Sequence, residues 1–317
     1  MEAILELPSS LPEHIPAALK AVPARIVSEW PAGTFVENLA VLDDGSVAVS
    51  VLSEARVDRV TLDGERSVLH QFAAPTTGLA VMHGHLFVAV GAPGAGAPTL
   101  WRIDPQSRDV QPWMIIEGSV FINGVAAFDN TRLIAADSWH GALLLLDFET
   151  RSTSVWLQDE RLTRAPECDM LPGANGVKRY RNEITVSSNG RALLLRAPIR
   201  SDGSASSLEL IADKLRVDDL AYDQTGNLYL CTHIGASLDR LTREGERVSL
   251  AGVAQGLAGS TACAFGRTNG HRDKLYVTTT GGILLPVDGQ VQPAKLIELN
   301  VGAEGYTLEL PSKERMR

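Results

Sequence analysis

The hydrophobic and polar positions of the chain repeat in units of roughly 40 to 50 residues. Each unit has a polar residue, a short apolar run, a turn and a second β-rich run. The runs are short and lack a period of 3.6 residues, which favours strands over helices. The pattern therefore predicts an all-β fold, a six-bladed β-propeller with four-stranded antiparallel blades around a central channel. The six units begin near Glu37, Thr77, Asn123, Asn175, Asp218 and Thr261.

The turns and the later strands of the units support this interpretation. Gly, Asn and Asp gather at the first turn, as in residues 43–45 and 224–227, which suits a tight hairpin. A third strand is expected where further apolar runs follow, at residues 56–64, 99–106, 142–150 and 237–245.

The N-terminal stretch is expected to close the ring of blades. Residues 23–31, PARIVSEWP, supply an outer strand that pairs with the last blade, around residues 281–287 and 294–301. This pairing would leave no sheet edge open. Residues 8–24 contain four prolines and are expected to form an irregular wrap. Residues 1–317 thus form one predicted domain.

Composition and charge narrow the class of protein. The 317 residues are 44% hydrophobic and 21% charged, with a net charge of -9, as in a globular protein with a sizeable core. No Lys/Arg cluster stands beside aromatic residues, which argues against nucleic-acid and anionic-membrane partners. The N-terminus resembles no signal peptide and no apolar run is long enough to span a membrane, so a cytoplasmic location is expected. The pattern indicates no oligomeric state.

The cysteines do not predict a covalent framework. Cys168, Cys231 and Cys263 are odd in number and lack the CxxC spacing of a zinc site. Three free thiols in a reducing compartment is the simpler interpretation.

The first residue of each unit should face the channel, because the innermost strand of each blade begins there. Carboxylates, carboxamides and hydroxyls form this predicted ring, without thiols or imidazoles. Hard oxygen donors of this kind suit calcium, magnesium or manganese. The plainer interpretation is a polar, water-filled channel whose residues cap their own backbones. The ring consists of Glu37, Thr77, Asn123, Asn175, Asp218 and Thr261.

The rim above this ring is predicted from strand direction. A second strand runs antiparallel to the first, so its end lies on the same face as the first strand's start. This places residues 137–140, with Trp139 and His140, beside His233 and the loop 91–98. The longer loop 159–174 is a candidate lid. For both histidines, a structural hydrogen bond to backbone competes with a role in proton transfer.

With these residues in register, the sequence resembles the family of senescence marker protein (regucalcin), gluconolactonase and drug-responsive lactonase. The resemblance spans nearly the whole chain and implies a six-bladed propeller that binds one divalent ion and hydrolyses lactones. Calcium is the first candidate, with magnesium, manganese or zinc as alternatives. The implied ligands are Glu37 of FVENLAV, Asn123 of FINGVAA, Asn175 of GANGVKR and Asp218 of RVDDLAYD.

Three departures from the family pattern bear on the substrate. Phe121 stands where sugar-lactone-hydrolysing members carry an arginine, so a less polar small-molecule substrate is expected. Asp219 adds a carboxylate beside Asp218, and either could be the inward one. The fourth blade lacks the usual aspartate after its second strand. The expected substrate contacts are Phe121, Trp139, His140, Thr77 and Thr261.

The predicted function is metal-dependent hydrolysis of a lactone or related ester. Asp218 would help to accept the proton of a bound water, and His233 would be a second proton-transfer group. Phosphotriester hydrolysis and non-hydrolytic condensation or isomerisation are alternatives on the same fold. A non-enzymatic scaffold stabilised by an ion is a further alternative.

Overall fold

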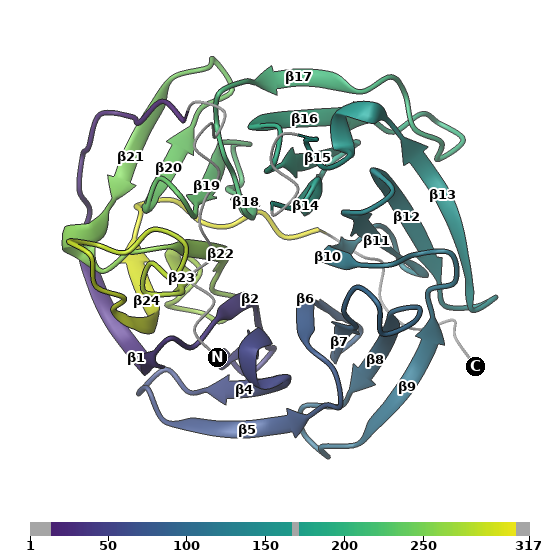
Figure 1. The fold of residues 1–317 in the computed structure, drawn as a ribbon, viewed down its shortest axis with the longest axis horizontal. Helices are drawn as coiled ribbons and strands as arrows, with labels where there is room; N and C mark the ends of the chain where they lie inside the picture. Colours follow the sequence, from purple (N-terminus) through teal and green to yellow (C-terminus); the bar gives the residue numbers. More distant parts are fainter. Residues whose placement is uncertain (1–13, 167–170, 309–317) are drawn as a thin grey trace.

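The computed structural model describes residues 14–166 and 171–308. In this part of the chain, 24 strands form six four-stranded antiparallel sheets around a central channel (Figure 1). The predicted six-bladed propeller is confirmed. Helix in the described part is limited to three short 3-10 turns, at Leu52–Glu54, Glu160–Leu162 and Val253–Gln255. None of the described helices is long and apolar enough to span a membrane.

Blades 1 to 3 follow one another along the chain, each running from an innermost to an outermost strand. Blade 1 consists of β2 (Val36–Val41), β3 (Val47–Val51), β4 (Arg56–Val60) and β5 (Arg66–Gln71). Blade 2 consists of β6 (Thr76–Met82), β7 (His85–Val90), β8 (Thr99–Ile103) and β9 (Val110–Ile115). Blade 3 consists of β10 (Ile122–Ala127), β11 (Arg132–Asp137), β12 (Ala142–Asp147) and β13 (Ser152–Gln158).

Blades 4 and 5 repeat this order, and blade 6 borrows its outermost strand from the N-terminus. Blade 4 consists of β14 (Ala174–Tyr180), β15 (Glu183–Ser188), β16 (Leu193–Pro198) and β17 (Glu209–Ala212). Blade 5 consists of β18 (Leu220–Tyr222), β19 (Leu228–Thr232), β20 (Ser237–Leu241) and β21 (Arg247–Ala251). Blade 6 consists of β22 (Ser260–Phe265), β23 (Lys274–Thr279), β24 (Pro293–Asn300) and β1 (Ala24–Ala32).

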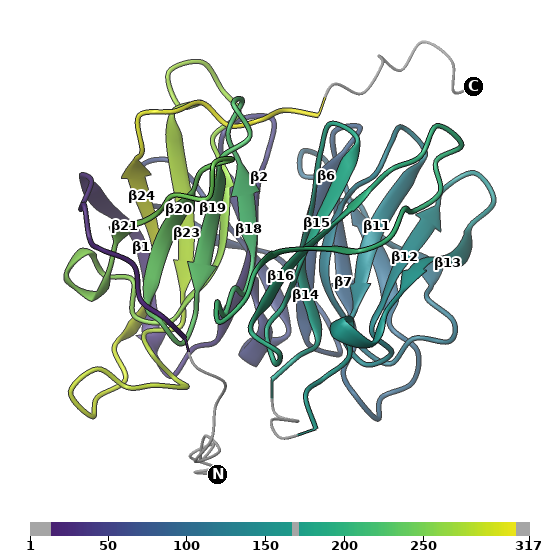
Figure 2. The same ribbon diagram turned by 90° about the horizontal axis from the view of Figure 1, so that it is seen from above.

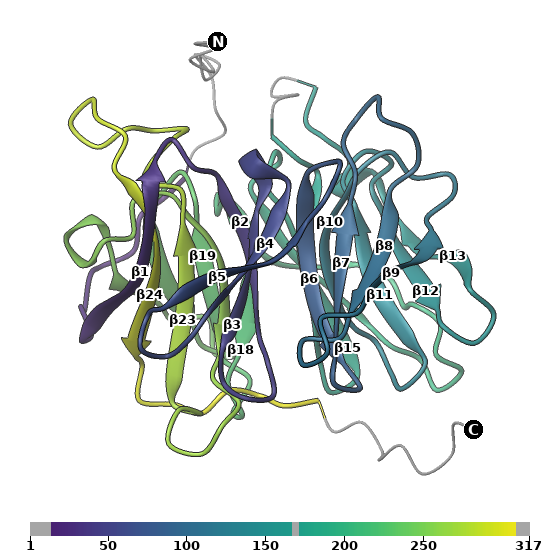
Figure 3. The same ribbon diagram turned by 90° about the horizontal axis from the view of Figure 1, so that it is seen from below.

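Ring closure by the N-terminal strand is confirmed. β1 pairs antiparallel with β24, with Ala24 opposite Leu299 and Trp30 opposite Ala294 (Figure 3). Of the two expected partners, residues 294–301 are correct, but residues 281–287 form no strand. Gly281 and Gly282 both have positive φ, of 72° and 84°, which turns the chain away from the sheet after β23.

The expected N-terminal wrap falls partly on residues 1–13, outside the described residues. From His14 onward, the segment runs along the outer edge of blade 5. Leu19 forms a parallel bridge with Ser249, and the Lys20 backbone N–H donates to the Ser249 carbonyl at 2.7 Å. The exposed edge of β21 is thereby partly covered.

The hydrophobic core lies between the blades. Each of the six main clusters of buried side chains draws its members from two neighbouring blades, such as Val177 of blade 4 against Leu143 of blade 3. Both faces of most inner strands are therefore covered, which explains their continuous apolar runs. Cys231 and Cys263 are buried free thiols in the cluster between blades 5 and 6. Cys168 lies outside the described residues.

The two ends of the channel differ. We call the end where the innermost strands begin the near mouth, and the end where they finish the far mouth. After β24 the chain crosses the far mouth (Figure 2). There Asp223 bridges Gly305, and the Tyr306 backbone N–H donates to the Tyr222 carbonyl at 2.8 Å. The Tyr306 ring packs against Tyr180 with centroids 4.7 Å apart.

Candidate active site

The near mouth holds a pocket of about 300 Å³ with a polar floor and an apolar wall. Four of the six ring residues reach this floor from four different blades, and the imidazole of His233 lies beside them. The floor residues are Glu37, Asn123, Asn175, Asp218 and His233. The apolar wall includes Phe35, Leu52, Pro93, Phe121, Trp139, Leu171, Pro172 and Leu284.

Backbone irregularities aim the floor residues into the channel. The pairing of β2, β10 and β14 with their neighbours shifts register at the first residues of the strand, around Glu37, Asn123 and Asn175. A bulge of this kind turns a side chain out of the regular alternation. Asp218 precedes β18, where its N–H donates to the Cys231 carbonyl at 2.8 Å.

The glycines after the two asparagines allow neighbouring blades to approach at the channel. A Cβ added at Gly124 would lie 2.5 Å from the Asn175 carbonyl oxygen. One added at Gly176 would lie 2.6 Å from the Cα of Asp219. The glycine of each Asn-Gly pair is therefore a steric requirement, since only glycine leaves room for the next blade.

The carboxylates of the floor are close enough to influence one another. Glu37 is 8% exposed, and its pKa is raised well above its ordinary value by burial and then by the carboxylates of Asp218 and Asp219. Glu37 is therefore either a neutral acid or the partner of a positive charge.

Asp218 and Asp219 point to different places. Asp218 lines the pocket, where it accepts a hydrogen bond from Asn175 Nδ2 at 2.6 Å through Oδ1. Asp219 instead accepts from Lys178 Nζ at 2.6 and 2.8 Å. Burial raises the pKa of Asp219, and the Lys178 ammonium opposes that shift. The inward carboxylate is thus that of Asp218.

His233 is held on both sides of its ring. Nδ1 lies 3.0 Å from Asp218 Oδ2, and Nε2 lies 3.1 Å from Thr280 Oγ1. This chain of contacts has the connectivity of a nucleophile triad. However, Thr280 is fully buried and does not line the pocket. Its hydroxyl therefore anchors the imidazole, and the imidazole in turn orients Asp218.

Three predicted contacts are not brought to the pocket. Thr77 Oγ1 donates to the Ile122 carbonyl at 2.7 Å, and Thr261 Oγ1 donates to the Val36 carbonyl at 2.9 Å. Both hydroxyls therefore link neighbouring blades, which differs from the plainer interpretation that the ring residues cap their own backbones. His140 Nδ1 lies 2.9 Å from Asp137 Oδ2, outside the pocket lining.

The two predicted aromatic contacts do line the pocket. Phe121 faces it from the residue before β10, and Trp139 faces it from the turn after β11. The guanidinium of Arg164 lies 3.6 Å from the centroid of the Trp139 ring. Arg164 belongs to the predicted lid loop 159–174, which also contributes Leu171 and Pro172. Residues 167–170 of that loop lie outside the described residues.

Sequence reasoning missed Asn189, which lines the pocket from the turn after β15. Its backbone is fixed, since its N–H donates to the Gly173 carbonyl at 3.1 Å and its carbonyl accepts from Arg216 Nη1 at 2.9 Å. Its side-chain Oδ1 is buried and has no hydrogen-bond partner among the described residues. Such an acceptor costs free energy unless a ligand or water satisfies it. The absence of the family's aspartate after this strand was the available signal.

The floor fits a divalent ion by the chemistry of its donors. Within the described residues, no three His, Cys, Asp or Glu side chains are grouped as metal ligands. A cation would therefore rely on the two carboxylates of Glu37 and Asp218 together with the carboxamides of Asn123 and Asn175. Hard oxygen donors of this kind suit calcium or magnesium. Burial, and then the nearby carboxylates of Asp218 and Asp219, raise the pKa of Glu37, and a positive charge at the floor would offset both effects.

The proteins similar to the chain in sequence carry different names from the proteins similar to it in fold. No protein-family model matches the chain. It is 24% identical over 336 residues to a Phoma protein named "Putative hetero-Diels-Alderase", covering 89% of this chain and 91% of that protein. A second protein of that name, from Sarocladium schorii, is 24% identical over 325 residues, with 83% and 79% covered.

Similar solved structures are propellers of the gluconolactonase and regucalcin type. A calcium-binding regucalcin of Agrobacterium tumefaciens has a TM-score of 0.70 at 14% identity, covering 94% of this chain and all of that one. A gluconolactonase of Xanthomonas campestris has a TM-score of 0.66 at 16% identity, with 93% and 96% covered. At these identities the structural likeness shows the fold, and proteins named for two different enzyme chemistries are similar to the chain.

Proposed function

We propose that the chain is an enzyme that hydrolyses a lactone or related ester of low polarity, assisted by a divalent cation. The observation that carries the proposal is the convergence of Glu37, Asn123, Asn175, Asp218 and His233 at the floor of one apolar-walled pocket. Enzyme sites combine an apolar enclosure with a few convergent polar groups in this way. The enzyme names of the similar proteins support a catalytic role.

Four residues would hold the cation: Glu37, Asn123, Asn175 and Asp218. A bound divalent ion supplies Lewis acidity toward an ester carbonyl and lowers the pKa of a water molecule. The two carboxamides are neutral donors, so only the carboxylates of Glu37 and Asp218 would balance the formal charge of the ion.

The protein's own groups would place and move the proton of the attacking water. Asp218 presents its carboxylate to the pocket while His233 fixes its orientation from one side at 3.0 Å. Asp218 is positioned to accept the proton, and the His233 ring is the next group along the hydrogen-bonded chain. A positioned acid–base group of this kind contributes about 10² to 10⁴ in rate.

The wall of the pocket would select an apolar substrate. Phe121 and Trp139 face the pocket, and Phe121 cannot hydrogen-bond a sugar hydroxyl. Burying apolar surface against such a wall is worth about 25 cal/mol per Å². Asn189 offers one carboxamide to a polar group of the substrate.

Metal analysis followed by turnover assays tests the proposal. We expect one divalent ion per purified chain and hydrolysis of dihydrocoumarin that is lost with a chelator and restored by calcium or manganese. Carrying out the reaction in ¹⁸O-labelled water should place the label in the product carboxylate. A metal-loaded protein that turns over no lactone or ester would contradict the hydrolase and favour a scaffold.

A second candidate, non-hydrolytic cycloaddition, is favoured by one specific observation. Burial, and then the carboxylates of Asp218 and Asp219, raise the pKa of Glu37, which favours the protonated acid beside the Asp218–His233 pair when no cation is bound. An acid and a hydrogen-bonded imidazole can activate the carbonyl of a heterodiene inside an apolar pocket. The 24% identical relatives carry hetero-Diels-Alderase names. A substrate with an α,β-unsaturated carbonyl and an alkene should then cyclise without uptake of ¹⁸O and without need for a cation.

A further inference from the structure

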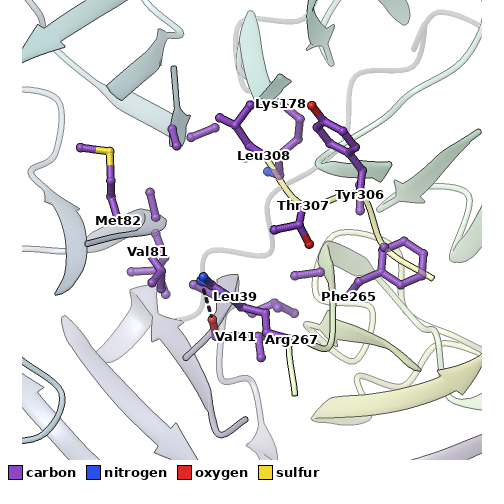
Figure 4. Close-up of a pocket in the computed structure, with 18 of the residues that line it drawn as sticks. Leu39, Val41, Val81, Met82, Lys178, Phe265, Arg267, Tyr306, Thr307 and Leu308 are labelled. Atoms are coloured by element: carbon purple, nitrogen blue, oxygen red, sulfur yellow. Dashed lines mark hydrogen bonds between the residues drawn. The ribbon is translucent and has the colours of Figure 1, made fainter. Parts of the chain in front are cut away.

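Lys178 reaches the carboxylate cluster from the far side of the channel. It lies on β14, three residues after Asn175, and it lines a second pocket of about 580 Å³ at the far mouth. Figure 4 shows it there beside Leu308 of the C-terminal segment. Its ammonium contacts both carboxylate oxygens of Asp219, at 2.6 and 2.8 Å. The pair therefore connects a residue of the far pocket to the neighbour of Asp218, which lines the near one.

The backbone around Asp219 leaves its side chain little freedom to turn toward the near pocket. Its carbonyl accepts from the Cys231 N–H at 2.9 Å, and the Gly176 N–H donates to the Asp218 carbonyl at 2.9 Å. Gly176 packs so closely that an added Cβ would also lie 2.6 Å from Asp219 Oδ1. Asp219 is only 3% exposed. Lys178 thus meets a carboxylate that the fold has already turned away from the site.

The Lys178–Asp219 pair also affects the net charge of the buried carboxylate group. Glu37, Asp218 and Asp219 bring three carboxylates to one buried region, and Lys178 brings one ammonium. With Glu37 ionised, as a cation ligand would be, the net formal charge of the group is minus two, which one divalent ion would neutralise. Buried charges are costly when they are not compensated.

We propose that Lys178 is the internal counter-ion of the floor, which keeps Asp219 out of the ligand set and sets the charge that a divalent cation meets. Lys178 is a positioning residue in this account, since it acts through Asp219. The inference rests on the cation of the proposed function, but not on the reaction that follows.

Other buried aspartates show why this pair differs. Asp239 is fully buried and lies 3.7 Å from Arg247, in the third strand of blade 5. Asp58 is likewise held by Arg56 at 2.8 Å in the third strand of blade 1. Neither pair lines the near pocket, so each stabilises a blade without facing the floor.

The test is calorimetric titration of calcium into chelator-treated full-length protein. Asp219→Asn alone leaves Lys178 uncompensated beside the floor, and we expect it to weaken calcium binding at least tenfold. The double variant K178M/D219N restores the net charge of minus two, so its dissociation constant should lie within about threefold of that of the wild type. The double variant D239N/R247M is the matched control and should bind calcium like the wild type.

Other results for the D219N and K178M/D219N proteins overturn the inference. If the D219N protein binds calcium as the wild type does, Lys178 sets no charge at the floor. If K178M/D219N loses tenfold or more, Asp219 is itself a ligand. If Asp219→Asn does not fold, K178M/D219N still tests whether Asp219 is a ligand, and Lys178→Met, which makes the net charge more negative, should tighten calcium binding; an unchanged dissociation constant would then overturn the inference. If the wild-type protein does not bind calcium, both the role of Lys178 and the proposed cation site are contradicted. If it binds calcium but hydrolyses no lactone, only the proposed hydrolase activity is contradicted.

Discussion

The two mouths of the channel have similar origins but different chemistry. Both are lined by innermost strands from the blades, and the far pocket is the larger, at about 580 against 300 Å³. Its strand residues are mainly small and apolar, such as Ala40, Val81 and Ala127. Two of its basic side chains are paired with carboxylates: Lys178 binds Asp219, and Arg267 lies 3.2 Å from Asp43.

The near mouth instead brings together buried carboxylates and carboxamides whose charges and hydrogen-bond acceptors are not all paired within the described residues. Glu37 has a raised pKa, Asn189 has an acceptor unused by the described residues, and Asp218 lies at the centre of a hydrogen-bonded chain. Volume therefore does not identify the reactive end. Our assignment of the reactive end to the near mouth instead rests on its close carboxylates and its buried acceptor unpaired within the described part of the chain, because such groups are stabilised by a bound ligand.

The largest expected effect comes from removing the carboxylate at the centre of the near mouth. Asp218→Asn should lower kcat/KM at least 1,000-fold and abolish calcium binding, since it removes both a ligand and a proton acceptor. Asp43→Asn at the far mouth is the matched control and should change neither by more than about twofold. Steady-state assays and calorimetry measure both. Equal losses in the two variants would erase the distinction between the mouths.

Replacing the imidazole should have the next largest effect. His233→Gln keeps a polar side chain but loses the ring between Asp218 and Thr280, so we expect kcat to fall about 100-fold. KM for dihydrocoumarin should change little, because the apolar wall remains. A rise in KM with unchanged kcat would instead assign His233 to substrate binding.

A change in the apolar wall should alter specificity rather than the reaction. Wild-type protein should prefer dihydrocoumarin over gluconolactone, and Phe121→Arg should reduce that preference about tenfold. An unsatisfied hydroxyl against Phe121 would cost about 1 to 3 kcal/mol. Comparing specificity constants for both lactones tests this. A wild-type preference of tenfold or more for gluconolactone would contradict the apolar pocket.

The pKa of Glu37 predicts how pH affects the protein without cation. Because the folded-state pKa lies above the ordinary 4.5, protonated Glu37 contributes stability that is full below that value and is lost as pH rises through the folded-state pKa. With chelator present, Glu37→Gln should therefore melt above the wild type by a margin that grows from pH 5 to pH 8. Calcium should stabilise only the wild type. A margin that does not change with pH would contradict the shift.

The smallest effect on activity is expected from the far mouth. Tyr306→Ala removes the ring that packs against Tyr180 and the hydroxyl that accepts from the Arg181 N–H at 3.1 Å. The melting temperature should fall by a few degrees, because a partly buried aromatic side chain is lost. The specificity constant should stay within about twofold. A large loss of turnover with little change in melting temperature would bring the far mouth into the mechanism.

The sequence predicted the architecture because a propeller repeats one pattern six times. Short apolar runs and turn glycines located the blades, and the start of each run located the channel. The N-terminal strand followed from the need to cover an edge. The segment 281–287 was misjudged because its apolar letters resemble a strand, while the positive φ of Gly281 and Gly282 appears only in three dimensions.

The site was less fully predictable, because ring position does not fix side-chain direction. The strand starts at all four positions shift register, yet Asn123 and Asn175 reach the pocket, whereas Thr77 and Thr261 bond to the next blade. A short hydroxyl side chain reaches only the nearest carbonyl. The contact of Asp219 with Lys178 is cross-blade as well, 41 residues apart, and no local pattern predicts it.

The most direct test of the account is anomalous diffraction from crystals equilibrated with manganese. We predict one peak at the near mouth, within about 2 to 2.6 Å of oxygens from Glu37, Asn123, Asn175 and Asp218. Lys178 should remain bound to Asp219 in the same map. No peak at that floor, or a peak at the far mouth beside Asp43, would contradict the claim that the near mouth holds the reactive site.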